Sequence, residues 1–157
     1  MVLYLIQHGE AKSAEEDPER RLTDKGMADV YNVALFMKKL SITVHQIFHS
    51  NKKRAEQTAV IIAQHIPSHN GIVQTDGLAP HDNPRIWYER LLSIDHDTIL
   101  VGHLPHLRRL SSLLLCGDEE REVIQFIMAG VVCLNRLEHL WSISWMITPD
   151  LIVPSIS

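Results

Sequence analysis

A short apolar run that stops abruptly at His8 and Gly9 is the feature that most constrains the fold of this chain. The run begins at Val2 and is long enough for a buried strand but too short for a core helix. Open α/β sheets place their chemistry just beyond the carboxyl ends of strands, so a strand here would present His8 where a catalytic side chain belongs. Gly9 lacks a Cβ and could let the chain turn sharply and a ligand approach the backbone. The alternative is a histidine that merely closes a strand.

Strand-like and helix-like segments alternate along the rest of the chain. Apolar periodicity predicts helices over about 24–39, 52–66, 84–92 and 104–115. Apolar runs predict strands within 2–7, 42–49, 72–74 and 98–101, followed by a hairpin of 131–137 and 141–147. Thr23 and Ser50 are the expected caps of the first two helices, Pro67 should end the second, and the tail after Pro149 should be peripheral. The alternation predicts an α/β fold, a three-layer α/β/α sandwich with a mixed, mostly parallel central sheet, as a single domain over residues 1–157.

The composition is that of an ordinary globular protein, with 45% hydrophobic and 22% charged residues. The formal net charge of -4 and the lack of a basic face argue against a nucleic-acid partner. No apolar stretch approaches the length of a membrane span, and the N-terminal run lacks the features of a signal peptide. Cys116 and Cys133 lie in apolar surroundings, so we expect two reduced, buried thiols in a cytoplasmic protein.

Three of the predicted strands end in residues with matching chemistry, namely Gln7-His8-Gly9, the run 50–54 and Gly102-His103. Because the carboxyl ends of parallel strands lie along one edge of a sheet, the three ends could converge. A neutral histidine can attack phosphorus, an arginine fork can hold two phosphate oxygens, and a second histidine can donate to the transition state. The start of the helix after His103 could add a backbone N–H. This set suits phosphoryl transfer without a metal ion or other cofactor.

These motifs resemble those of the histidine phosphatase superfamily, whose fold is phosphoglycerate mutase-like, and within it the small phosphohistidine phosphatases of the SixA type. The resemblance is carried by Leu-Ile-Gln-His-Gly-Glu-Ala at 5–11, Arg-Arg-Leu-Thr-Asp-Lys-Gly at 20–26, Ser-Asn-Lys-Lys-Arg-Ala-Glu-Gln-Thr-Ala at 50–59 and Val-Gly-His-Leu-Pro at 101–105. Each motif alone is weak evidence for the family. Four motifs in the family's order, spanning most of the chain, are specific evidence for it.

The resemblance implies a role for each matching residue. His8 matches the phosphorylated nucleophile, Arg54 the phosphate-binding arginine, and His103 the second histidine of the pocket. Arg20 aligns with an arginine that often precedes the helix, and for it a phosphate contact and a solvated loop position are equally open. The expected phosphate-binding set is Gln7, Gly9, Arg54, His103, the backbone of Leu104 and, as the open case, Arg20.

Position 7 departs from the family, which usually has Arg-His-Gly where this chain has Gln7 before His8. A glutamine can donate hydrogen bonds to a phosphate oxygen but brings no charge. Since a charge-assisted hydrogen bond is roughly twice as strong as a neutral one, we expect a rate loss of roughly tenfold to a thousandfold. A phosphate- or phosphohistidine-binding module with little or no activity is therefore an alternative to an enzyme.

The surroundings of the site bear on the substrate. Family members that act on sugar phosphates use an acidic residue to protonate the leaving group and carry an insertion over the pocket, whereas the segment 76–97 is short here. Asp82 and Glu89 are the available acids, and for both a structural or solvated position is favoured over a general acid. Phosphohistidine leaves readily once its imidazole is protonated. We therefore expect a phosphorylated protein as partner, for example a histidine-containing phosphotransfer domain. A small-molecule phosphomonoesterase or mutase is the alternative function. The oligomeric state is left open.

Ten histidines raise the alternative of a metal site. Neither His-Glu-x-x-His nor any paired-cysteine spacing occurs. His103 and His106 share one helical turn but have no evident third ligand. We therefore predict no metal.

Overall fold

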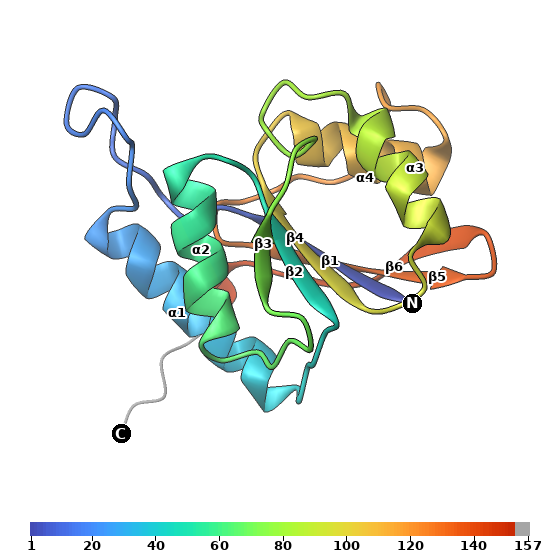
Figure 1. The fold of residues 1–157 in the computed structure, drawn as a ribbon, viewed down its shortest axis with the longest axis horizontal. Helices are drawn as coiled ribbons and strands as arrows, with labels where there is room; N and C mark the ends of the chain where they lie inside the picture. The colour runs from blue at the N-terminus through green and yellow to red at the C-terminus, as the bar shows by residue number, and fades with distance from the viewer. Residues whose placement is uncertain (153–157) are drawn as a thin grey trace.

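The computed structural model describes residues 1–152 and has a central sheet with helices on both faces (Figure 1). In chain order the elements are β1 (Val2–Gln7), α1 (Asp24–Lys39), β2 (Gln46–His49), α2 (Lys53–Ala63), β3 (Ile72–Gln74), α3 (Pro84–Ser93), β4 (Thr98–Gly102), α4 (His106–Cys116), β5 (Val131–Leu137), β6 (Leu140–Ile147) and the 3-10 turn η1 (Pro149–Leu151). Each predicted helix and strand is present, with shifted ends in α2 and α4.

The strands form one sheet in the order β3-β2-β4-β1-β5-β6. Neighbours from β3 to β1 are parallel, whereas β5 runs antiparallel to β1 and β6 antiparallel to β5. The predicted mixed, mostly parallel sheet is therefore confirmed. β1 and β4 lie in the middle of the sheet and are buried on both faces, which explains why their sequences are continuous apolar runs.

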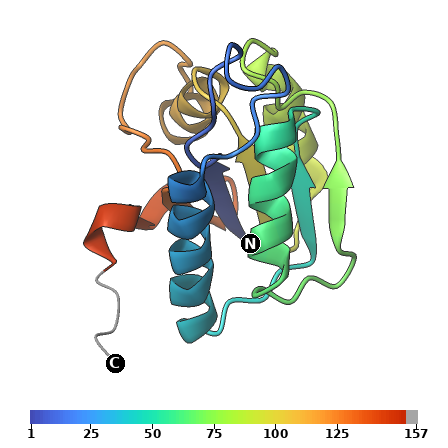
Figure 2. The same cartoon turned by 90° about the vertical axis from the view of Figure 1, so that its left-hand side faces the viewer.

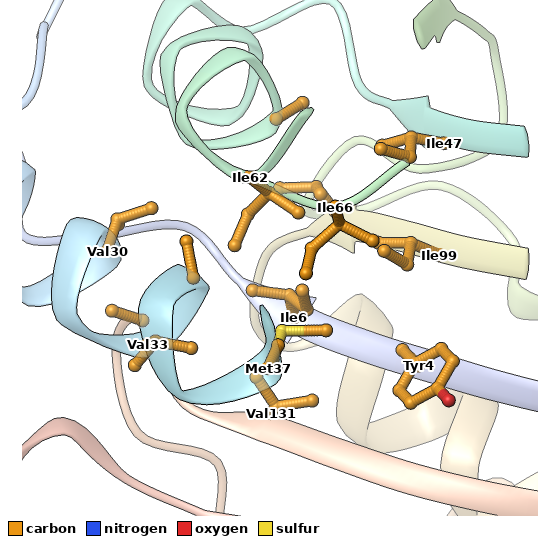
Figure 3. Close-up of a cluster of buried hydrophobic side chains, with 14 of the residues drawn as sticks. Tyr4, Ile6, Val30, Val33, Met37, Ile47, Ile62, Ile66, Ile99 and Val131 are labelled. Carbon is orange, nitrogen blue, oxygen red and sulfur yellow. The ribbon is translucent and has the colours of Figure 1, made fainter. Parts of the chain in front are cut away.

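Helices α1 and α2 cover one face of the sheet, and α3 and α4 cover the other (Figures 1 and 2). On the first face, Val33 and Met37 of α1 and Ile62 of α2 pack with Ile6 and Ile99 of the strands in a fully buried cluster (Figure 3). The cluster on the other face includes Leu5, Trp87, Leu91, Leu100, Leu107 and Leu110. The predicted three-layer α/β/α sandwich is confirmed.

Two helix ends differ from the prediction. α2 ends at Ala63, three residues before Ile66, the residue whose helical geometry Pro67 disfavours. The chain continues as a turn that still buries Ile66. α4 begins at His106 instead of Leu104, so Leu104 precedes the helix.

Thr23 caps α1 as predicted, and its side chain accepts a hydrogen bond from the N–H of Gly26. The predicted cap of α2 is wrong, because Lys52 is the N-cap and makes no side-chain capping bond. The hydroxyl of Ser50 has other partners, which belong to the site described below.

Cys133 is buried as expected, but the expectation of a buried Cys116 is wrong. Cys116 is the last residue of α4 and lies beyond Leu114, the last buried residue of that helix. The left-handed conformation of Gly117, with φ of 70°, then ends the helix. Apolar neighbours in sequence therefore do not bury this thiol.

The turn η1 follows β6 and contacts α1, and Ile152 packs against the cluster between α1, α2 and the sheet. The remainder of the tail, which was expected to be peripheral, lies outside the described residues. No helix within residues 1–152 is both long enough and apolar enough to cross a membrane.

Candidate active site

The strand register brings the three predicted strand ends together. Gln7 of β1 pairs with Gly102 of β4, so His8 and His103 follow side by side, and the N–H of His8 donates to the carbonyl of Gly102 at 3.0 Å. On the other side of β4, the end of β2 brings Ser50 to the same edge of the sheet. The convergence expected from parallel strands is present.

His8 lies directly after β1 and is 9% exposed. Its Nδ1 lies 2.7 Å from the carbonyl oxygen of Gly9. A carbonyl only accepts, so this contact places the proton of the neutral ring on Nδ1 and the lone pair on Nε2. Burial lowers the pKa of His8 to about 4, the Gly9 carbonyl opposes that shift, and the charge of Arg54 adds to it. At neutral pH His8 is an uncharged imidazole with an available lone pair, which is the form that attacks phosphorus.

His103 lies next to His8, with the ring centroids 4.9 Å apart, and only 1% of it is exposed. Burial lowers the pKa of His103 to about 2, and the proximity of His8 and Arg54 lowers it further. Its Nε2 lies 2.6 Å from Oγ of Ser50, whereas its buried Nδ1 has no hydrogen-bond partner among the described residues. His103 is therefore neutral and has one unused ring nitrogen.

Arg54 occupies the first turn of α2, and Thr58 lies one turn later on the same face. The hydroxyl of Thr58 donates to the carbonyl of Arg54 at 2.8 Å and accepts the N–H of Gly9 at 3.1 Å. Thr58 thereby ties the helix that carries Arg54 to the loop that follows His8. Burial lowers the pKa of Arg54, as does the charge of Arg20, although an arginine stays protonated in proteins.

Unsatisfied polar atoms are concentrated at this edge of the sheet. Within residues 1–152, five buried side-chain atoms lack a hydrogen-bond partner, and three of them are Oε1 of Gln7, Nε of Arg54 and Nδ1 of His103. The other two are the ring nitrogens of His106. Buried polar groups are nearly always paired, so such a cluster indicates a place that a ligand completes. Arg54 is always a donor and a neutral histidine can be one, so an oxyanion would satisfy these two atoms, whereas Oε1 of Gln7 is an acceptor that would need a donor.

A cavity of about 870 Å³ opens beside Arg54. Figure 2 shows the loops that follow β1 and β3 at the same end of the sheet, and both loops line the cavity. Its charged lining residues are Glu19, Arg20, Lys52, Lys53, Arg54, Glu56 and Asp82. Arg54 lines the cavity, and its charge also acts on His8 and His103, so this arginine links the histidine pair to the cavity.

The structure brings Arg20 close to the predicted catalytic group. Its Nε donates to the carbonyl of Lys12 at 3.1 Å, and its backbone has a φ of 50°. Arg20 lines the cavity, and its charge lowers the pKa of both His8 and Arg54. Arg20 is exposed on its loop and also lines the cavity, so the choice between a phosphate contact and a solvated loop position stays a prediction.

The two candidate acids lie in different places. Asp82 lines the cavity, and its Oδ2 accepts the N–H of Ala79 at 2.9 Å, which closes a turn. Glu89 is exposed on α3 and does not line the cavity. Of the two acids, Asp82 is therefore the one within reach of a ligand in the cavity. Its carboxylate also accepts the hydrogen bond that closes the turn.

Gly9 and Leu104 have surroundings that the sequence did not indicate. A Cβ on Gly9 would lie 2.8 Å from Cγ2 of Val30 and 2.9 Å from the carbonyl oxygen of Gly26, so this glycine lets α1 approach the end of β1. Its N–H is already bonded to Thr58. Leu104 lines a separate hollow with residues such as Phe126. Gly9 thus has a packing position, whereas Leu104 is exposed, and the part of both residues in phosphate binding stays a prediction.

Ser50 and Thr58 are the neighbours of the site that sequence reasoning missed. The sequence indicated a helix cap for Ser50 and an inner helix face for Thr58. Both lie within the matching motif at 50–59, and Thr58 follows Arg54 by four residues, which is the spacing that places two side chains on one helix face. No group of three or more His, Cys, Asp or Glu side chains in residues 1–152 is arranged to hold a metal ion.

A sequence profile of the histidine phosphatase superfamily (branch 1) matches residues 3–82, the part of the chain that contains His8, Arg54 and Asp82. An uncharacterised protein of Picosynechococcus sp. is 34% identical over 143 residues, which cover 86% of this chain and 85% of that protein.

Solved structures share the fold over nearly the whole chain. The protein histidine phosphatase SixA complexed with tungstate has a TM-score of 0.83 and 20% identity, covering 96% of this chain and 98% of its own. The alpha-ribazole phosphatase of Shigella flexneri has a TM-score of 0.77 and 15% identity, covering 95% and 97%. A phosphoserine phosphatase of Entamoeba histolytica in complex with phosphoserine has a TM-score of 0.71 and 15% identity, covering 97% and 99%. At these identities the likeness establishes the fold.

Proposed function

The chain belongs to the histidine phosphatase superfamily, and we propose that it is a metal-independent protein phosphohistidine phosphatase that works through a phosphorylated His8. The observation that carries the proposal is a pair of buried atoms, Nε of Arg54 and Nδ1 of His103, that have no partner among the described residues and lie next to a neutral His8. A phosphoryl group would offer oxygens to both donors and phosphorus to the lone pair of His8. These three groups then form the catalytic set.

The reaction has two halves. In the first, Nε2 of His8 attacks the phosphoryl group, the bond from phosphorus to the substrate imidazole breaks, and the leaving imidazole takes up a proton. In the second, the oxygen of a water molecule attacks phospho-His8 and gives up a proton to solvent, the bond from phosphorus to Nε2 breaks and returns the lone pair to Nε2, and inorganic phosphate leaves. Arg54 and His103 stabilise the negative charge on the phosphoryl oxygens in both halves.

Gln7 and Arg20 complete the phosphate site in this proposal. Gln7 is 8% exposed and lies one residue before the nucleophile, where its amide can donate a neutral hydrogen bond. Arg20 contributes a second positive charge from the loop after β1. The charge that the family usually has at position 7 is thus supplied in part from another segment.

Two features favour phosphohistidine in a protein as the substrate. The segment 76–97 is short, and most of it is α3, whose Trp87 and Leu91 are buried in the core against α4. Only residues 79–82 of this segment line the cavity. The cavity is lined by four basic side chains and three carboxylates, and two of the basic ones, Lys52 and Arg20, are exposed and could contact acidic groups of a protein. A phosphohistidine leaving group also needs little help from an acid, and Asp82 is bonded to its own turn.

A binding module without turnover is the second candidate function. The observation that favours it is Gln7, which leaves a buried Oε1 without a partner where the family usually has an arginine. Such a protein would hold phosphate or phosphohistidine through Arg54 and His103 but lack the charge that completes the transition state.

The experiment that tests the proposal measures phosphate release from a phosphorylated histidine phosphotransfer protein, together with a panel of small phosphomonoesters. We expect turnover of the phosphoprotein, trapping of an acid-labile phosphoryl group on the wild-type protein, and loss of both in His8→Ala. The matched control is His81→Ala, since His81 lines the same cavity and has no role in the mechanism. Undiminished activity of His8→Ala would overturn the nucleophile assignment, binding without turnover would favour the binding module, and a preference for small esters would contradict the substrate.

A further inference from the structure

The hydroxyl of Ser50 connects two parts of the site that lie far apart in sequence. Ser50 follows β2, is 1% exposed, and places its Oγ 2.6 Å from Nε2 of His103, which lies 53 residues later. The same Oγ accepts the N–H of Lys52 at 3.2 Å. A serine expected to cap a helix is thus bonded to the second histidine of the pocket.

Counting hydrogens fixes the direction of the bond between Ser50 and His103. A serine hydroxyl has one hydrogen to donate and can accept at its lone pairs, and the N–H of Lys52 already occupies one of these. Among the described residues, Nε2 of His103 is the acceptor within reach of the buried hydroxyl hydrogen. The hydroxyl therefore donates to Nε2, which must carry a lone pair.

A neutral imidazole has one proton, so a lone pair on Nε2 places the proton on Nδ1. Nδ1 is the buried atom of His103 that has no partner in residues 1–152. It becomes an N–H donor with nothing to donate to until an acceptor arrives. The opposite tautomer would put a lone pair at this atom, which repels an oxyanion.

We propose that Ser50 is a positioning residue that holds His103 as the Nδ1-protonated tautomer and so makes it a hydrogen-bond donor to a bound oxyanion. The statement about the oxyanion rests on the proposed function, whereas the tautomer itself does not.

The same logic separates the roles of the two histidines. His8 faces a carbonyl oxygen, so its Nδ1 is protonated and its Nε2 is a nucleophile. His103 faces a hydroxyl whose hydrogen is free to donate, so its Nε2 is an acceptor and its Nδ1 is a donor. The two neutral imidazoles, whose ring centroids lie 4.9 Å apart, thus have different roles because each ring is hydrogen-bonded to a different group.

The decisive measurement is the protonation state of the His103 ring nitrogens by two-bond ¹H–¹⁵N NMR at neutral pH, with the signals assigned by loss in His103→Asn. We expect a protonated Nδ1 and an unprotonated Nε2 in the ligand-free wild-type protein. Ser50→Ala should give a mixture or a reversal, whereas Ser50→Thr should keep the tautomer because it keeps the hydroxyl. A protonated Nε2 in the wild type overturns the proposal even if neither variant folds.

The second arm measures inorganic phosphate affinity and kinetics. Ser50→Ala should weaken phosphate binding at least tenfold and lower kcat by roughly a hundredfold with a smaller change in KM, because the donor acts most strongly on transition-state charge. The matched control is Ser111→Ala, which removes the hydroxyl of another fully buried serine, one that donates to a helix carbonyl. Phosphate affinity and kcat of Ser50→Ala equal to those of this control would contradict the proposal. Absence of turnover in the wild type, with the expected tautomer intact, would instead contradict the proposed function.

Discussion

The imidazole rings of His8 and His103 lie 4.9 Å apart at the carboxyl ends of neighbouring strands, and burial keeps both rings neutral at physiological pH. Placing a proton on either ring would put a charge on a buried side chain and would oppose protonation of the other. The chemistry proposed for the site needs both rings uncharged, so the same burial that prepares the nucleophile also makes the fold sensitive to acid.

Stability is expected to fall as the pH drops below about 6.5. The pKa of His8 and of His106 is lowered to about 4, and that of His103 to about 2, against an ordinary value of 6.5, with burial as the main cause in each. Below pH 6.5 the unfolded chain binds protons that the folded chain does not, so each group lowers the free energy of unfolding by up to about 1.4 kcal/mol per pH unit. The loss continues to about pH 4 for His8 and His106, and further for His103. Urea unfolding at pH 7.5, 6 and 5 measures it.

His106→Leu is the matched control for this pH dependence. Both ring nitrogens of His106 are buried and have no hydrogen-bond partner within residues 1–152, so an apolar side chain should leave stability at pH 7.5 unchanged or raise it. The variant should also lose roughly one third of the acid-dependent decrease assigned to the three histidines. Equal free energies of unfolding at pH 7.5 and pH 5 in the wild type would contradict the neutral state of these rings.

Gly26→Ala is expected to destabilise the protein by about 3 kcal/mol, although alanine is favoured over glycine in a helix by about 1 kcal/mol. A Cβ at position 26 would lie 2.1 Å from the carbonyl oxygen of Glu10, a backbone atom that cannot move away as a side chain could. Thermal and urea unfolding of the variant measure the change. Gly71→Ala is the control, because nothing lies within 4 Å of its added Cβ and only the left-handed backbone, with φ of 72°, should cost about 1 kcal/mol. A Gly26→Ala variant no less stable than this control would show that α1 can shift away from β1.

The convergence of His8, Arg54 and His103 could be predicted because it depends on strand order and register alone. Parallel neighbours present their carboxyl ends at one edge, and the motif spacing then places Arg54 in the first turn of the following helix. The role of Ser50 could not be predicted, since its partner lies 53 residues away and local pattern favours a cap.

Gly9, Arg20 and Cys116 illustrate other features of the structure that could not be predicted from the sequence. The need for glycine at position 9 comes from the approach of α1, which no local rule records. The position of Arg20 depends on how an irregular loop folds back over the cavity. The exposure of Cys116 depends on where α4 passes the end of its packed face, which composition does not reveal.

Asp82→Asn should leave turnover of a phosphohistidine protein within about threefold of the wild type. A protonated imidazole is a good leaving group, so the reaction does not need the rate gain of about 10²–10⁴-fold that a general acid typically contributes. The turn bond from Ala79 to Asp82 can be retained by the asparagine oxygen, so the loop should keep its shape. Steady-state kinetics with the phosphoprotein and with an alkyl phosphate measure the effect. A loss of a hundredfold or more on the phosphoprotein would assign Asp82 as a general acid and contradict the account of the leaving group.

Gln7→Arg should raise kcat on the phosphoprotein by roughly tenfold to a thousandfold, because it would add a charged donor where the site now has a neutral amide. Position 7 is 8% exposed and lies directly before His8, so the new guanidinium could donate to a phosphoryl oxygen bound at His8. Gln7→Met is the matched control: it keeps the length of the side chain, removes both the donor and the unpaired Oε1, and should lower kcat if the amide contributes at all. Circular dichroism and urea unfolding establish that each variant folds. Equal kcat values for wild type, Gln7→Arg and Gln7→Met, in proteins of equal stability, would mean that position 7 does not contact the transferring group, and that Arg54, His103 and Arg20 supply the whole of the stabilisation.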